Sequence, residues 1–62
     1  MQERIIRIVQ QVKAGSYRFQ IAETESRCGR QYVLNINGRP EYHSASLGQV
    51  QNYMDRYAER VM

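Results

Sequence analysis

The sequence predicts a small α+β domain built from a helix, a three-stranded antiparallel meander and a second helix, with both helices on one face of the sheet (αβββα). Three observations predict this arrangement. Apolar residues have helical spacing near both ends of the chain, they alternate with polar residues in between, and Asn37-Gly38 is a strong hairpin signal between two alternating runs. Sixty-two residues form a single domain, residues 1–62, because separate cores appear only in much longer chains.

Residues 3–13 are predicted to form the first helix. The apolar residues of this segment follow the i, i+3, i+4, i+7 spacing of an amphipathic helix: Ile5, Ile8, Val9 and Val12. Gly15 can supply the left-handed residue that ends such a helix. The segment is also rich in β-branched residues, which suit a strand.

The next part of the chain predicts the meander. Tyr17, Phe19 and Ile21 alternate with polar or small residues, and a second alternating run extends from Arg30 to Asn37, after a polar connection over residues 23–29. The parity of the apolar residues favours a three-residue loop that contains Asn37-Gly38, because a two-residue loop would place charges on the apolar face. The third strand, Pro40 to Ser44, is expected at an edge because proline cannot donate to a ladder.

A capping signature, Ser46 followed by Gln49, predicts the start of the second helix, which then continues to the end of the chain. The predicted core contains the apolar residues of both helices and of one sheet face: Ile5, Ile8, Val9, Val12, Phe19, Ile21, Tyr32, Leu34, Ile36, Tyr42, Leu47, Val50, Met54 and Tyr57. The opposite face is expected to stay open and to display Arg18, Gln20, Thr24, Gln31, Val33, Asn35, Glu41 and His43.

Composition narrows the function classes. One cysteine, Cys28, and one histidine, His43, cannot supply the ligands of a protein zinc site, and we expect neither a metal nor a cofactor. Two arginines beside Cys28 favour its thiolate, but no base and oxyanion site accompany it, so we expect no enzyme. The start of the chain does not resemble a signal peptide and no apolar run is long enough to span a membrane, so a cytoplasmic location is expected. A core this small also favours a homodimer.

Arginine accounts for eight of the nine basic residues, and the net charge is +3. Arginine pairs with phosphate, and Arg, Gln and Asn together suit base edges in a groove. We therefore expect a nucleic-acid-binding or accessory protein that uses residues on and around the sheet: Arg18, Gln20, Arg27, Arg30, Asn35 and Arg39. The predicted order over residues 17–60, three strands and then a helix, resembles that of the arm-binding domains of tyrosine recombinases, a likeness of arrangement that implies DNA binding.

An alternative function is a protein-interaction module, such as a small regulator or inhibitor of phage or plasmid type. It would act through the open sheet face, an exposed strand edge or the apolar first helix, where Ile6 lies beside the main apolar stripe.

Overall fold

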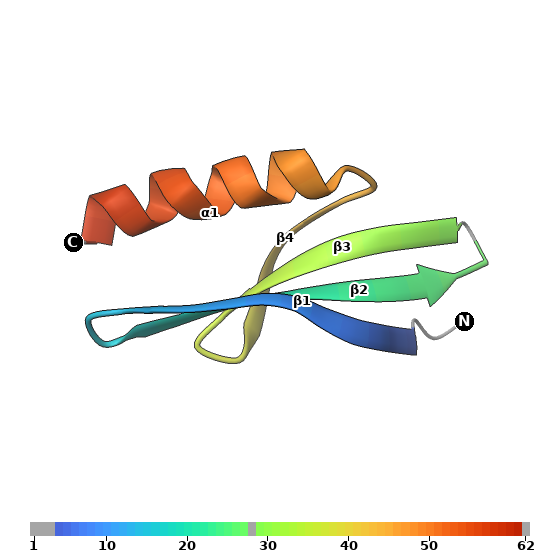
Figure 1. Cartoon of the computed structure of the whole chain (residues 1–62), viewed down its shortest axis with the longest axis horizontal. Coiled ribbons are helices and arrows are strands. Elements are labelled where there is room, and N and C mark those ends of the chain that lie inside the picture. Colours follow the sequence, from blue (N-terminus) through green and yellow to red (C-terminus); the bar gives the residue numbers. More distant parts are fainter. Residues whose placement is uncertain (1–3, 28, 62) are drawn as a thin grey trace.

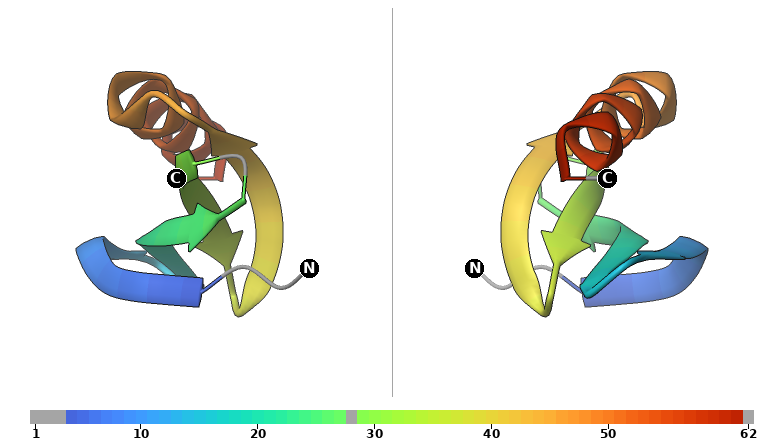
Figure 2. Two further views of the ribbon diagram at one scale, coloured as in Figure 1. Left: turned by 90° about the vertical axis from the view of Figure 1, so that its right-hand side faces the viewer. Right: turned by 90° about the vertical axis from the view of Figure 1, so that its left-hand side faces the viewer.

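A computed structural model describes residues 4–27 and 29–61. Within these residues the chain forms four strands and one helix: β1 (Arg4–Ala14), β2 (Tyr17–Ser26), β3 (Gly29–Ile36), β4 (Arg39–Ser44) and α1 (Leu47–Val61). The strands form one antiparallel sheet in the order β1-β2-β3-β4, and α1 packs on one face of it against β2, β3 and β4 (Figure 1). Figure 2 shows that the sheet is curved and that β1 is the strand farthest from α1.

The predicted first helix is wrong, because residues 4–14 form β1. Two register shifts against β2, between Ile5 and Arg7 and between Ile8 and Gln10, each insert an extra residue. Residues on one face of a strand normally recur every two positions, but each bulge lengthens that interval to three. A bulged strand therefore imitates helical spacing, and the β-branched composition of the segment is the better guide. The arrangement is ββββα, with a single helix, and not αβββα.

The first strand of the meander, β2, is longer than predicted. Residues 23–26, expected to be a connection, continue β2 and pair with the first residues of β3, from Ser26 opposite Gly29 to Glu23 opposite Tyr32. The polar composition of this segment does not prevent it from being a strand, because Glu23 finds charged partners there.

The turn between β3 and β4 differs from the prediction. Ile36 lies opposite Arg39, so Asn37 and Gly38 form a two-residue loop, and both have the positive φ that such hairpin turns require (54° and 85°). The parity argument was correct that one extra residue is needed, but the chain places it at Glu41. Leu34 therefore lies opposite Tyr42, and the apolar side chains of both strands share one face.

The C-terminal helix is confirmed. The Gln49 N–H donates to Ser46 Oγ at 3.4 Å, as the capping signature predicts. The Gln49 side chain does not return to the Ser46 backbone. Instead its Oε1 accepts from Ser44 Oγ at 2.8 Å, and that hydroxyl accepts from the Ser46 N–H at 3.1 Å. The end of β4 and the start of α1 are thereby tied together.

The core lies between α1 and the sheet. Its buried apolar residues are Ala14, Phe19, Ile21, Leu34, Ile36, Val50 and Met54. Tyr17, Tyr32 and Tyr42 pack against this core half-buried, as their parity predicts. Ile5, Ile8 and Val12, which were expected in the core, are exposed. Ile5 and Ile8 lie opposite Thr24 and Ala22 and so face away from α1, and the described residues form no second helix that could cover them.

Candidate nucleic-acid interface

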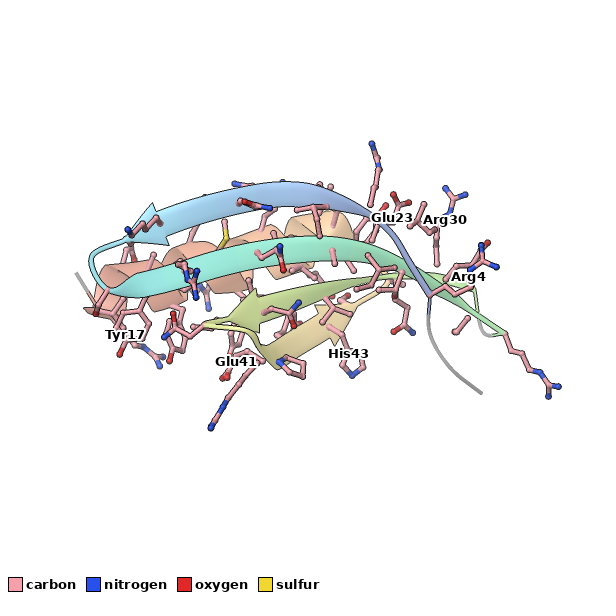
Figure 3. The ribbon with its side chains drawn as sticks, turned by 90° about the horizontal axis from the view of Figure 1, so that it is seen from below. Arg4, Tyr17, Glu23, Arg30, Glu41 and His43 are labelled. Carbon is pink, nitrogen blue, oxygen red and sulfur yellow. The ribbon has the colours of Figure 1, made fainter. Side chains whose placement is uncertain are left out.

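The sheet face opposite α1, here called the open face, can be followed from the strand register. Directly opposed residues of antiparallel strands point to the same side, and Phe19 and Ile21 mark the helix side of β2. The open face therefore contains Ile5, Ile8, Gln11, Lys13, Arg18, Gln20, Ala22, Thr24, Gln31, Val33, Asn35, Pro40 and His43. Ala22 and Thr24 are nevertheless buried, so the expected exposure of Thr24 is wrong. Figure 3 views the molecule from this side, with α1 behind the sheet.

The open face carries cations and no carboxylate among the described residues. Lys13 and Arg18 lie opposite each other on β1 and β2, close to the hairpin that joins these strands. The carboxylates of the sheet all belong to the other side: Glu23 and Glu25 are in register with helix-side residues, and Glu41 Oε2 accepts from the Tyr53 hydroxyl at 3.3 Å. The expectation that Glu41 belongs to the open face is therefore wrong, and the positive charge there is undiluted.

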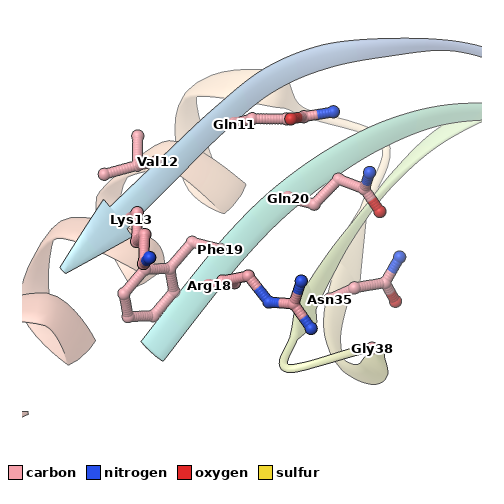
Figure 4. Close-up of a pocket in the computed structure, with 8 residues that line it drawn as sticks. All are labelled: Gln11, Val12, Lys13, Arg18, Phe19, Gln20, Asn35 and Gly38. Atoms are coloured by element: carbon pink, nitrogen blue, oxygen red, sulfur yellow. The ribbon is translucent and has the colours of Figure 1, made fainter. Parts of the chain in front are cut away.

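A cavity of about 500 Å³ lies at the Lys13–Arg18 end of the sheet. Its lining residues are Gln11, Val12, Lys13, Arg18, Phe19, Gln20, Asn35 and Gly38. In Figure 4 the side chains of Gln11, Arg18, Gln20 and Asn35 project from neighbouring strands toward the same side. The site thus combines two cationic groups with three primary amides, which can both donate and accept hydrogen bonds.

The local backbone fixes the position of Arg18. Its N–H donates to Asn37 Oδ1 at 2.9 Å, and its carbonyl accepts from the Asn37 N–H at 2.9 Å. Gln20 lies directly opposite Asn35 on the central pair of strands. Both amides are therefore carried by regular strand backbone, which holds them more firmly than a loop does.

The six residues predicted from sequence separate into two groups. Arg18, Gln20 and Asn35 come together on the open face. Arg27 and Arg30 lie at the opposite end of β2 and β3, about 20–30 Å of extended strand from Arg18. Arg39 is at the same end as Arg18, but its register opposite Ile36 turns it toward the helix side.

Two residues of the site, Gln11 and Lys13, were not predicted, because their segment was interpreted as a helix. In register with β2 they lie opposite Gln20 and Arg18 and extend the polar surface onto β1. The β-branched content of residues 5–12 was the signal that could have placed them on the sheet.

The arginines at the other end of the sheet have structural partners. Arg7 Nε donates to Glu23 Oε1 at 2.7 Å, and Arg30 Nη1 lies 3.4 Å from Glu23 Oε2. The side chain of Glu23 is 4% exposed, whereas those of Arg7 and Arg30 are 68% and 63% exposed. The hydrogen bond that Arg7 donates to Glu23, and then the charge of that carboxylate, raise the pKa of Arg7 above the ordinary value. A buried carboxylate needs such partners, so these cations stabilise the fold.

The tyrosines lie on the helix side, so among the described residues the only aromatic ring on the open face is that of His43. Tyr42 stacks on Tyr53 with ring centroids 4.4 Å apart, and Tyr57 contacts Tyr17 and Phe19 edge-on. Burial of the Tyr53 ring, and then the nearby Glu41 carboxylate, raise the pKa of Tyr53 above its ordinary value. The tyrosine rings are partly buried and line the edge of the core.

Comparison of the chain with protein-family models, with curated proteins and with solved structures found no match. No helix within the described residues is both long and apolar enough to cross a membrane. Cys28, whose reactivity was left open by the sequence, lies outside the described residues.

Proposed function

We propose that the chain binds duplex nucleic acid through the open face, with Lys13 and Arg18 at phosphates and with Gln11, Gln20 and Asn35 toward base edges. The observation that carries the proposal is the segregation of charge: the open face has cations and amides, and every carboxylate of the sheet in the described residues lies on the other side. Phosphate contacts dominate such binding, and they require positive charge that neighbouring carboxylates do not cancel.

The absence of aromatic side chains other than His43 on the described open face favours a duplex over a single strand. Proteins that hold single strands stack successive bases on aromatic rings, and here the tyrosines are engaged with α1. A regular strand pair that carries Gln20 opposite Asn35 fits the width of a major groove, where such amides pair with adenine.

The test is fluorescence anisotropy of a labelled mixed-sequence DNA duplex at salt concentrations from about 50 to about 200 mM. The variant is Lys13→Ala with Arg18→Ala. We expect its affinity to fall at least about tenfold and the slope of log K against log salt to decrease by about 2, one for each lost phosphate contact.

The matched control is Arg56→Ala with Arg60→Ala, which removes the same charge from exposed positions on α1. We expect this control to retain most of the affinity and the wild-type salt slope. Equal losses in the two double variants would show that only net charge matters, and the assignment of the open face would then be wrong.

A further inference from the structure

The two edges of the sheet are different. The β4 edge is six residues long and contains Pro40, features that discourage pairing with another strand. The β1 edge is eleven residues long and contains no proline. An edge of this length is a template for a further strand.

The exposed apolar side chains are concentrated on β1. Among the described residues, four large apolar side chains are exposed, and all of them belong to this strand: Ile5 (65%), Ile6 (44%), Ile8 (40%) and Val12 (38%). The chain exposes 4708 Å², compared with about 4,200 Å² for a compact monomer of 7.3 kDa. β1 contributes to this excess, because it is the strand that α1 covers least.

The register shows which backbone groups of β1 point away from the sheet. The hydrogen bonds of Arg18 with Asn37 turn its backbone toward β3. Alternate residues of a strand bond to opposite neighbours, so residues 20, 22 and 24 also turn toward β3. Their partners on β1 are Gln11, Ile8 and Ile5, whose N–H and C=O groups therefore point outward.

The spacing of these outward groups determines which kind of strand can pair with β1. In a regular strand they recur every two residues, whereas on β1 the bulges place Ile5, Ile8 and Gln11 three residues apart. A regular strand cannot follow this spacing over the whole edge. An antiparallel second copy of the same strand can, because the outward groups are evenly spaced on both sides of Ile8.

We propose that β1 pairs antiparallel with β1 of a second copy of this chain, with the two Ile8 residues opposite each other at the two-fold axis. Ile5 of each copy then lies opposite Gln11 of the other, Arg4 opposite Val12, and Arg7 opposite Val9, so no cation faces a cation. At the axis the two Ile8 side chains meet, and Ile5 of each copy lies diagonal to Ile8 of the other.

The pairing joins two sheets into one with eight strands. The two-fold axis is perpendicular to the sheet, so both helices lie on one side and both open faces on the other. Each copy would add its own Lys13 and Arg18 to a single surface. The pairing itself does not require nucleic acid, and the experiment that tests it is carried out without nucleic acid.

The test uses the symmetry of the pairing. Ile8→Lys and Ile8→Glu are made separately, and molecular mass is measured by light scattering from about 10 μM to about 1 mM, the range suited to an interface smaller than about 800 Å² per partner. We expect the wild-type chain to reach twice its monomer mass. Each variant alone should dissociate at least about a hundredfold more readily, because like charges then face each other at the axis. An equimolar mixture of the two variants should dimerise again.

The matched controls are His43→Lys and His43→Glu, at an exposed position on the β4 edge. We expect both to dimerise like the wild-type chain. Amide hydrogen exchange of the wild-type chain provides a readout without substitution: protection of the Ile5, Ile8 and Gln11 amides should rise with concentration. A wild-type monomer at about 1 mM, a charge mixture that stays monomeric, or a dimer whose Ile8 amide exchanges freely would each overturn the proposal.

Discussion

At the scale of single residues, Glu23 is the buried charge on which one end of the sheet depends. Its carboxylate has a strong partner in Arg7, at 2.7 Å, and a weaker one in Arg30, at 3.4 Å. Both guanidinium groups remain largely exposed, so their desolvation costs little free energy. The buried Glu23 carboxylate would be strongly destabilising without a charged partner. Arg7 is therefore expected to stabilise the fold more than Arg30 does, because its contact with Glu23 is the closer one.

Arg7→Ala tests this asymmetry. We expect the free energy of unfolding to fall by about 1–3 kcal/mol, because a buried carboxylate is left with its weaker partner. The control is Arg4→Ala, at an exposed position of the same strand opposite Glu25, where we expect a change within about 0.5 kcal/mol. Urea unfolding followed by circular dichroism measures both. Equal losses in the two variants would contradict the special position of Arg7.

At the scale of elements, two glycines test the local geometry of the turn and of the helix. Gly38 has a φ of 85°, and a Cβ there would meet nothing within 4 Å, so Gly38→Ala adds backbone strain without a clash. We expect a loss of about 1 kcal/mol in unfolding free energy.

Gly48 lies in α1 without a positive φ, so Gly48→Ala should raise the free energy of unfolding by up to about 1 kcal/mol. Thermal unfolding compares them, and effects of the same sign would contradict the assigned conformations.

The elements differ in how far the sequence predicts them. α1 and the register of Phe19 and Ile21 follow from spacing, because neither element is interrupted by an irregularity. β1 does not, since its bulges change the interval between same-face residues from two to three, which a single sequence cannot distinguish from a helical period. The β3–β4 turn shows the same limit: parity requires one extra residue but does not say where the chain places it.

At the scale of the whole molecule, the sequence predicts three of the five polar residues of the candidate site. Arg18, Gln20 and Asn35 were found because alternation assigns them to the face opposite the core. Gln11 and Lys13 were missed with the strand that carries them. Arg27, Arg30 and Arg39 were chosen for charge and for nearness to the sheet. The register separates Arg30 and Arg39 from the open face, and Arg27 lies beyond the end of β2. The same register places the carboxylates of the sheet on the helix side. This segregation of charge cannot be read from the amino-acid composition.

The measurement that tests the central claim most directly is an amide NMR titration of the labelled chain with a short DNA duplex, at about 50 and about 200 mM salt. We predict chemical-shift changes at Lys13, Arg18, Gln20 and Asn35 that weaken at the higher salt, with α1 unaffected. Changes concentrated on α1, or none at either salt concentration, would contradict the assignment of the open face as a nucleic-acid interface.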